Sequence, residues 1–134
     1  MYAELRKETE RTTQNVQDLD EYAITTIKSE FQKLNKDQLK AIQIVDGPLQ
    51  IIAGPGSGKT LVLVLRALYL LLSEKAKPRQ IILTTFTDKS AVEIRDRLHQ
   101  YATSCGYKGP LYEMRIGTFH SLCNEIITNT SNLI

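Results

Sequence analysis

The stretch QIIAGPGSGKTLVLV, residues 50–64, decides the fold. A short apolar run leads into a glycine-rich loop that ends in Lys59-Thr60, and a second apolar run follows it. A strand, a glycine loop and a helix in this order are the setting of a phosphate-binding loop. The pattern G-x-x-x-x-G-K-[ST] has Ala53 at its first position in this chain. Alanine is the smallest side chain that can replace glycine there, so we interpret the stretch as a variant of that loop.

The residue types in this loop suit a triphosphate for physical reasons. Glycines let the backbone curl so that successive N–H groups point into one concavity, which the N terminus of the following helix reinforces with positive partial charge. Lys59 adds a full charge near the β- and γ-phosphates, and the Thr60 hydroxyl is a ligand for Mg²⁺. We therefore predict that ATP and Mg²⁺ bind here, with Lys59 and Thr60 as catalytic candidates. The other predicted nucleotide-binding residues of the loop are Gly54, Pro55, Gly56, Ser57, Gly58 and Leu61.

The bulk properties of the chain are those of one globular domain without an extreme charge. It has 134 residues, of which 42% are hydrophobic and 24% charged, and its net charge is +2. That charge is too balanced to indicate nucleic-acid binding by itself. Cys105 and Cys123 show no metal-binding or redox spacing, so a reducing cytoplasm is the expected location.

The chain shows no signal for secretion or for a membrane span. Its first residues are polar and charged, without the apolar core of a signal peptide. The one long apolar stretch, residues 61–72, is interrupted by Arg66 and is shorter than the roughly 20 residues that a bilayer needs. We expect no membrane partner and interpret the stretch as a buried helix.

The part of the chain before the glycine loop is expected to be mainly helical. Residues 1–33 carry one apolar stripe at spacings of three and four, which predicts an extension that docks through this stripe. A short helix is predicted over 37–44 after Asn35 as its N-cap, and a turn over 46–48. The run 49–53 is predicted to be a short buried strand. The stripe consists of Val16, Leu19, Ala23, Ile27 and Phe31.

After the loop, strands and helices are predicted to alternate. Thr87 is the expected N-cap of the helix over 88–102. In the helix over 120–130, Leu122, Ile126 and Ile127 are expected to face inward. Alternation of this kind is typical of a parallel sheet covered by helices on both faces, which places the fold in the α/β class. The predicted elements are a helix over 59–73, a strand over 81–86, a helix over 88–102, a strand within 112–119 and a helix over 120–130.

Four segments of the chain resemble, in order and spacing, the first four motifs of superfamily 1 DNA helicases of the UvrD/Rep type. They are LNKDQLKAI, AGPGSGKT, ILTTFTDKSAVEIRDRL and IGTFHSLC. The resemblance covers residues 34–127 and implies a P-loop NTPase of the RecA-like kind, a three-layer sandwich around a parallel sheet. The expected organisation is a helical extension over 1–33 and the first part of an ATP-binding helicase domain over 34–134.

The resemblance also implies roles around the nucleotide. Gln38 matches the glutamine that hydrogen-bonds adenine in the family, a task that suits an amide because it donates and accepts at once. Taken without the family, Gln38 is a surface glutamine on a short helix. The family often has arginine directly after the threonine of the loop. This chain has Leu61 there, which offers no guanidinium to the nucleotide.

The third segment matches the motif that lies on the path of single-stranded DNA in the family. Phe86 is expected to stack on or pack beneath a base, with Thr87 and Lys89 as further DNA contacts. Core packing on a strand is an equal alternative for Phe86, because strand residues alternate faces. Asp88 stands where asparagine is commoner, and we expect it to face the N terminus of its helix.

The fourth segment matches a second DNA-contacting motif of the family. Thr118, His120 and Ser121 are placed at a strand-to-helix junction, where hydroxyls, an imidazole and free amides suit DNA phosphates. For His120 the alternative is a helix-capping histidine without a ligand. His99, in the middle of a helix, is interpreted as part of a solvated face.

Hydrolysis of ATP in this family needs an acidic pair after an apolar strand, and no such run in this chain ends in Asp-Glu. The chain is therefore expected to be the N-terminal piece of a longer helicase, which moves 3′ to 5′ along single-stranded DNA. Its other expected partner is the remainder of that helicase, and unpaired sheet edges predict self-association. A stand-alone P-loop module that binds nucleotide without motor work is the alternative. A small-molecule kinase is a weaker third reading.

Overall fold

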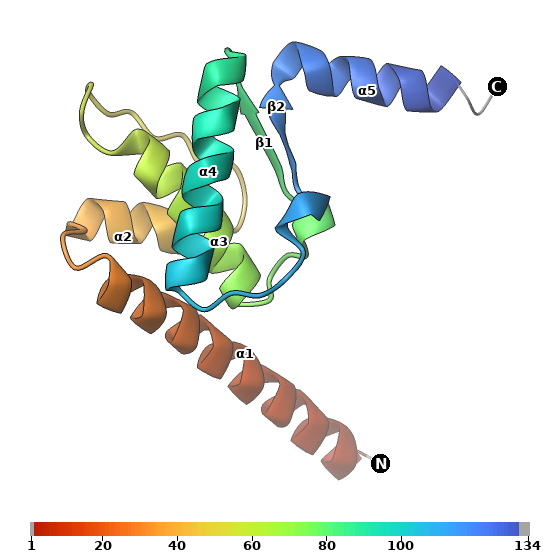
Figure 1. Cartoon of the computed structure of the whole chain (residues 1–134). Coiled ribbons are helices and arrows are strands. Elements are labelled where there is room, and N and C mark those ends of the chain that lie inside the picture. Colours follow the sequence, from red (N-terminus) through yellow and green to blue (C-terminus); the bar gives the residue numbers. More distant parts are fainter. Residues whose placement is uncertain (1, 132–134) are drawn as a thin grey trace. The chain divides into compact units, whose positions relative to one another are not determined.

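A computed structural model of the chain describes residues 2–131 (Figure 1). The chain divides into two compact units, residues 1–76 and 77–134, and each is described here by itself. The first unit contains the helices α1, α2 and α3. The second contains the parallel pair of strands β1 and β2 with the helices α4 and α5.

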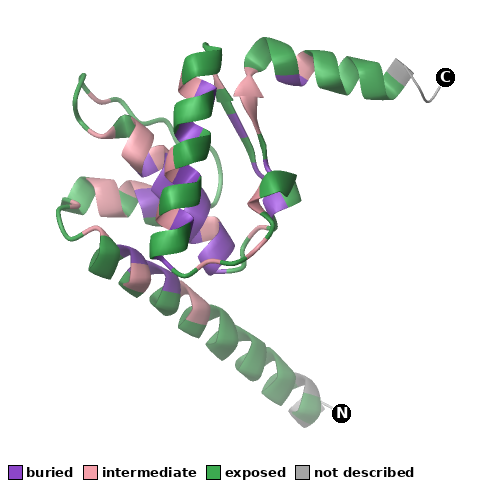
Figure 2. Ribbon diagram, in the orientation of Figure 1, coloured by how far each residue is buried: buried purple, intermediate pink, exposed green. Residues whose placement is uncertain are grey.

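The first helix, α1 (Tyr2–Glu30), confirms that this part of the chain is helical. Its expected apolar stripe is buried only toward its C-terminal end, where Ala23 and Ile27 are completely buried. Val16, two turns earlier, is 46% exposed, which contradicts the inward position predicted for it. Figure 2 shows the earlier part of the helix exposed along its described length. The helix therefore docks through its second half.

The second helix, α2 (Lys36–Gln43), begins at the predicted cap. The Asn35 side chain accepts a hydrogen bond from the Gln38 amide at 2.9 Å, and the Asn35 amide donates to Gln38 Oε1 at 3.0 Å. These reciprocal bonds form a capping box, which satisfies two amides at the helix start. Ile42 is fully buried, and α2 packs against α3.

The third helix, α3 (Lys59–Leu72), follows the glycine loop and forms the centre of the first unit. Both α1 and α2 pack against it. Eight of its residues are buried, as its near-continuous apolar sequence predicts: Val62, Val64, Leu65, Ala67, Leu68, Tyr69, Leu71 and Leu72.

The strand predicted over residues 49–53 is not present. This segment is irregular, Ile51 is 45% exposed and Ile52 is 90% exposed. A strand exists only where another backbone accepts and donates its ladder of hydrogen bonds. In the part of the chain that the structure describes, β1 and β2 pair only with each other. The prediction of a buried strand at this position was therefore wrong.

A polar clasp joins α1 to the end of α3. The Tyr69 hydroxyl donates to Asp20 Oδ1 at 3.1 Å, and the Lys75 ammonium lies 3.1 Å from the other oxygen of the same carboxylate. Burial, and secondarily the hydrogen bond to Asp20, raises the pKa of the Tyr69 hydroxyl to about 12. The clasp fixes the docked half of α1 beside the buried contacts at Ala23 and Ile27.

The second unit is a small parallel sheet with helices packed on it. The strands pair in register, with Ile82 beside Arg115 and Thr85 beside Thr118. The predicted parallel sheet is thus present as two strands. The elements of this unit are η1 (Pro78–Gln80), β1 (Ile82–Thr85), α4 (Asp88–Ser104), η2 (Leu111–Glu113), β2 (Arg115–Thr118) and α5 (Phe119–Ser131).

Both helices of this unit pack against the two strands. Ala91, Ile94 and Leu98 are buried on α4, and the Arg95 guanidinium donates to the Ile116 carbonyl of β2 at 2.8 Å.

On α5 the described side chains are mostly exposed. Leu122 is buried as predicted, but Ile126 and Ile127 are 49% and 63% exposed, so the prediction that they face inward was wrong. A two-stranded sheet offers too little surface to cover more than the first turns of a helix of this length.

No helix in the described part of the chain combines the length and the apolar character that a bilayer crossing requires.

Candidate functional site

The glycine loop between residue 53 and α3 has the curled backbone that its sequence predicts. Gly56 and Gly58 have φ angles of 75° and 81°, in the left-handed region where side chains are disfavoured. The Ser57 hydroxyl donates to the Gly54 carbonyl at 2.6 Å and closes the turn. Gly54 itself has no positive φ angle. Two of the three loop glycines therefore supply the unusual conformation.

The Lys59 side chain folds back over this loop. Its ammonium donates to the carbonyls of Ala53 and Gly54, both at 2.9 Å. No side chain caps the N terminus of α3, whose N-cap residue is Gly58. The first amides of a helix carry positive partial charge, so the loop presents both an ammonium group and a helix N terminus to an anion.

Gln38 connects α2 to the glycine loop. Its Nε2 donates to the Ser57 carbonyl at 3.1 Å, while its Oε1 accepts from the Asn35 amide. The φ angle of Gly58 favours glycine, and a Cβ atom there would lie 2.9 Å from Gln38 Nε2, so the end of the Gln38 side chain would have to shift. The amide of Gln38 keeps one further donor and acceptor position.

A cavity of about 410 Å³ lies beside the loop, entirely within the first unit. Its wall combines apolar side chains with the cationic groups of Lys59 and Arg66. A mostly apolar pocket with a few polar groups is the usual form of a small-molecule site. The lining residues are Asn35, Asp37, Gln38, Ala41, Ile51, Ile52, Ala53, Ser57, Lys59, Val62, Leu63 and Arg66.

Two predicted nucleotide residues lie slightly apart from this cavity. Thr60 and Leu61 are half-buried in the first turn of α3. Neither is among the residues that line the cavity, although the next two residues, Val62 and Leu63, are. Among the described residues, no group of three or more His, Cys, Asp or Glu side chains could hold a metal ion.

The residues predicted to contact DNA lie in the second unit, at the carboxyl end of the sheet. Because Thr85 pairs with Thr118, the residues that follow the two strands emerge at the same edge. Phe86 is 101% exposed, which excludes the alternative that it packs in the core. Phe119, after β2, is 62% exposed.

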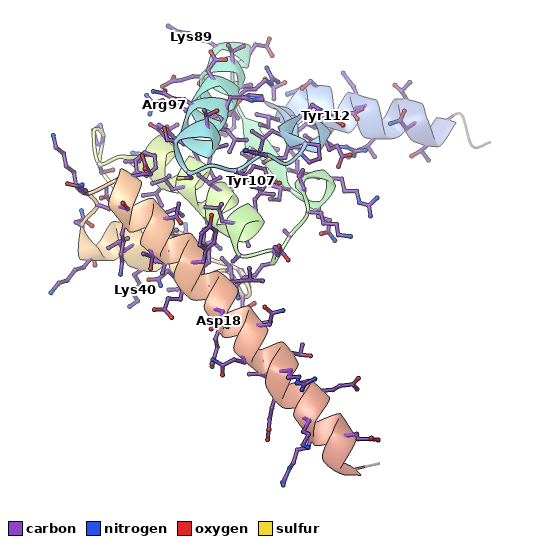
Figure 3. All side chains as sticks on the ribbon, turned by 60° about the horizontal axis from the view of Figure 1, so that its bottom comes forward. Asp18, Lys40, Lys89, Arg97, Tyr107 and Tyr112 are labelled. Carbon is purple, nitrogen blue, oxygen red and sulfur yellow. The ribbon has the colours of Figure 1, made fainter. Side chains whose placement is uncertain are left out.

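Hydroxyl groups begin both helices at this edge. Thr87 accepts from the Ser90 amide at 3.1 Å as the cap of α4, as predicted, and Asp88 is the first residue of that helix. Thr118 accepts from the Ser121 amide at 3.2 Å in the same manner. Lys89 is exposed at the start of α4 (Figure 3), and His120 and Ser121 are exposed in the first turn of α5. The predicted residues of each motif are therefore brought together, each set within its own unit.

Two residues of these sites escaped the sequence analysis. Phe119 could have been found because it stands after β2 as Phe86 stands after β1. Arg66 could have been found because it follows Lys59 by seven residues, which places both on one face of a helix. Its guanidinium donates to the Ala41 carbonyl of α2 at 2.7 Å and it lines the cavity.

Comparison with known proteins identifies the family of the chain. Residues 34–134 match the family model described as UvrD/REP helicase N-terminal domain. The chain belongs to this family. The match begins beside Asn35 and includes α2, the glycine loop and both strands, whereas α1 precedes it. The resemblance drawn from the four sequence motifs is confirmed.

Individual UvrD/REP relatives match a large part of the chain. The ATP-dependent DNA helicase SRS2 of Saccharomyces cerevisiae is 46% identical over 86 residues, which is 64% of this chain and 7% of that protein. The ATP-dependent DNA helicase Rep of Buchnera aphidicola is 43% identical over 101 residues, 75% of this chain and 15% of the relative. UvrD1 of Mycobacterium leprae is 41% identical over 101 residues, 75% of this chain and 12% of the relative. The chain thus spans a small part of the length of these helicases.

Proposed function

We propose that this chain is the ATP-binding part of a DNA helicase, with the triphosphate at the glycine loop and the base in the adjoining cavity. The observation that carries the proposal is the meeting of three features in one unit. They are a loop with two left-handed glycines, the Lys59 ammonium beside it, and a cavity lined by Gln38. Mg²⁺ would bind through the Thr60 hydroxyl and the phosphates, the pairing typical of this loop pattern.

In this proposal Lys59 exchanges partners when ATP arrives. Its ammonium is held by two neutral carbonyls of the loop. Phosphate oxygens are charged acceptors, and hydrogen bonds between charged partners are roughly twice as strong as neutral ones. The lysine would therefore leave the carbonyls for the triphosphate, while the loop amides and the start of α3 hold the remaining oxygens.

The edge of the sheet at Phe86 and Phe119 is the proposed path of single-stranded DNA. Exposed aromatic rings stack on any base, which suits a protein that moves without regard to sequence. Lys89, His120 and the hydroxyls that begin α4 and α5 would hold the phosphates. The proposed whole protein is a RecA-like motor that couples ATP hydrolysis to 3′ to 5′ movement on this strand.

The chain by itself is proposed to bind nucleotide without turning it over. No strand-like run ends in the Asp-Glu pair that hydrolysis requires. The one adjacent Asp-Glu pair, Asp20-Glu21, lies in α1, and Asp20 is engaged with Tyr69 and Lys75. ATP hydrolysis by the purified chain that rises on addition of single-stranded DNA would contradict this part of the proposal.

The Lys59→Ala substitution tests the phosphate site. It removes the only full positive charge within the loop, so the affinity for ATP should fall at least about tenfold, while the affinity for adenosine should stay within about twofold. Titration calorimetry with both ligands measures the difference. Lys40→Ala, at an exposed position of α2 outside the cavity, is the matched control. Equal loss of ATP and adenosine binding would show that the loop is not the phosphate site.

A further inference from the structure

In the first unit, an arginine on α3 connects this helix to α2. Arg66 lies on α3, seven residues after Lys59, and its Nη1 donates to the Ala41 carbonyl of α2 at 2.7 Å. Ala41 belongs to the last turn of α2, where carbonyl groups have no partner within the helix and carry negative partial charge. A guanidinium there supplies both the missing donor and a favourable charge.

The two ends of α2 are therefore held by different parts of the nucleotide site. At its start, Gln38 Nε2 donates to the Ser57 carbonyl of the glycine loop at 3.1 Å. At its end, Arg66 holds the Ala41 carbonyl from α3. Gln38 and Ala41 are three residues apart and lie on the same side of the helix, and both line the cavity with Arg66.

We propose that Arg66 is a positioning residue for recognition of the base: it fixes α2 against α3 so that the free donor and acceptor of Gln38 face the cavity beside the phosphate loop. This inference rests on the proposed nucleotide site. The capping box fixes the Gln38 amide relative to α2. Among the hydrogen bonds of the described residues, those of Arg66 and of Gln38 with Ser57 fix the two ends of α2 to the glycine loop and α3.

The chemistry of the two contacts gives them unequal strength. The Arg66 bond is charge-assisted, short and partly buried, whereas the Gln38 bond joins two neutral groups in an exposed position. When a base enters the cavity and takes the Gln38 amide, the Ser57 contact is free to break while the Arg66 contact persists. Arg66 would then be the remaining polar tie that holds α2 in place during nucleotide binding.

The test compares ATP with inorganic tripolyphosphate, which offers the phosphates without a base. In Arg66→Met the affinity for ATP should fall about tenfold, the value of one good hydrogen bond, while that for tripolyphosphate changes by less than about twofold. Arg66→Lys, which keeps a charged donor, should recover part of the ATP affinity. Arg97→Met, at a helix position paired only with Glu93 in the second unit, is the control.

A second measurement keeps the inference separate from the proposed function. Hydrogen exchange of the α2 amides in the free chain should become about tenfold faster in Arg66→Met, while exchange in the middle of α3 stays unchanged. Unchanged exchange in α2, or equal weakening of ATP and tripolyphosphate, would overturn the role of Arg66. If the unsubstituted chain binds neither ligand, the proposed function fails, and the exchange result still decides whether Arg66 positions α2.

Discussion

Each unit of the molecule contains a short apolar run that leads through a loop into a helix, but only one of the two runs is a strand. In the second unit the run becomes β1, which pairs in parallel with β2 and buries Leu83. In the first unit the run over 49–53 stays irregular and leaves Ile52 90% exposed. Both runs contain leucine and β-branched residues, so the difference teaches that an apolar run forms a strand only where it has a pairing partner.

The first unit is held instead by helix packing and side-chain hydrogen bonds. Both α1 and α2 pack against α3. Hydrogen bonds of Asp20 with Tyr69 and of Arg66 with the Ala41 carbonyl add polar contacts between these helices. The second unit is held by its ladder of backbone bonds and by the helices on it. Substitutions should therefore affect the two units through different interactions, as the following predictions state from the largest effect to the smallest.

The largest contrast is expected between the two apolar runs themselves. Leu83→Ala should lower the free energy of unfolding by about 2–4 kcal/mol, because it removes a buried side chain and leaves a cavity. Ile52→Ala should change it by less than about 0.5 kcal/mol, because Ile52 is exposed. Urea denaturation followed by circular dichroism measures both. A comparable loss in the two variants would mean that the run over 49–53 is buried in solution.

The clasp of the first unit predicts a dependence of stability on alkaline pH. The pKa of Tyr69 is raised to about 12 in the folded chain, above its ordinary value. A raised pKa stabilises the fold fully below the unfolded value, near 10, and the contribution is lost as the pH rises toward 12. The loss should be on the order of 2 kcal/mol.

Tyr69→Phe is the variant that isolates this effect. It should be less stable than the unsubstituted chain at pH 8, because it leaves Asp20 without the phenol donor. Between pH 10 and pH 12 its stability should fall less steeply, and the two denaturation curves should approach each other. Parallel pH profiles for the two proteins would show that the Tyr69 hydroxyl titrates normally.

The loop predicts a difference between two glycines with similar φ angles. Gly56→Ala and Gly58→Ala both place a side chain at a left-handed position, at a cost of about 1 kcal/mol each. At Gly56 the added Cβ meets nothing within 4 Å, whereas at Gly58 it meets Gln38 Nε2 at 2.9 Å.

Only Gly58→Ala should therefore disturb base recognition in addition to the loop. Calorimetry should show a lower ratio of ATP to tripolyphosphate affinity in Gly58→Ala than in Gly56→Ala, by about threefold to tenfold. Equal ratios in the two variants would indicate that Gln38 moves aside without consequence for the base.

The smallest effect on stability, and the most direct test of the exposed run, concerns self-association. Ile51 and Ile52 present apolar surface on a segment without a strand partner in the described residues. Such a segment favours pairing between chains. Ile52→Lys should shift the chain toward a monomer in light scattering while its unfolding free energy changes by less than about 0.5 kcal/mol. If the unsubstituted chain is monomeric at high concentration, this prediction is wrong.

The sequence was most informative where the determinants are local. Asn35 and Thr87 were identified as caps because their side chains bond to amides two or three residues away, and both do so in the structure. The glycine loop and α3 followed from residue types that permit few other conformations. The two parallel strands followed from alternation with helices.

Failures occurred where the outcome depends on distant groups. The burial of residues 49–53 and of Ile126 depends on how much sheet surface lies beside them, which no local pattern reports. Phe86 was left undecided because stacking and packing need the same aromatic residue, and only its exposure separates them. Arg66 was seen only as an interruption of an apolar run, since its partner is a backbone carbonyl 25 residues earlier.

The half-docked state of α1 has a consequence for how the chain responds to proteases. The described residues from Arg6 to Asp18 are exposed, so cleavage in that stretch would trim the chain and leave the first unit intact. Cleavage between Asp20 and Ile27 would instead remove buried apolar residues that pack on α3. It would also separate Tyr69 and Lys75 from the Asp20 carboxylate that both contact. The tolerance of this chain to shortening should thus end abruptly, within two helical turns, at the clasp.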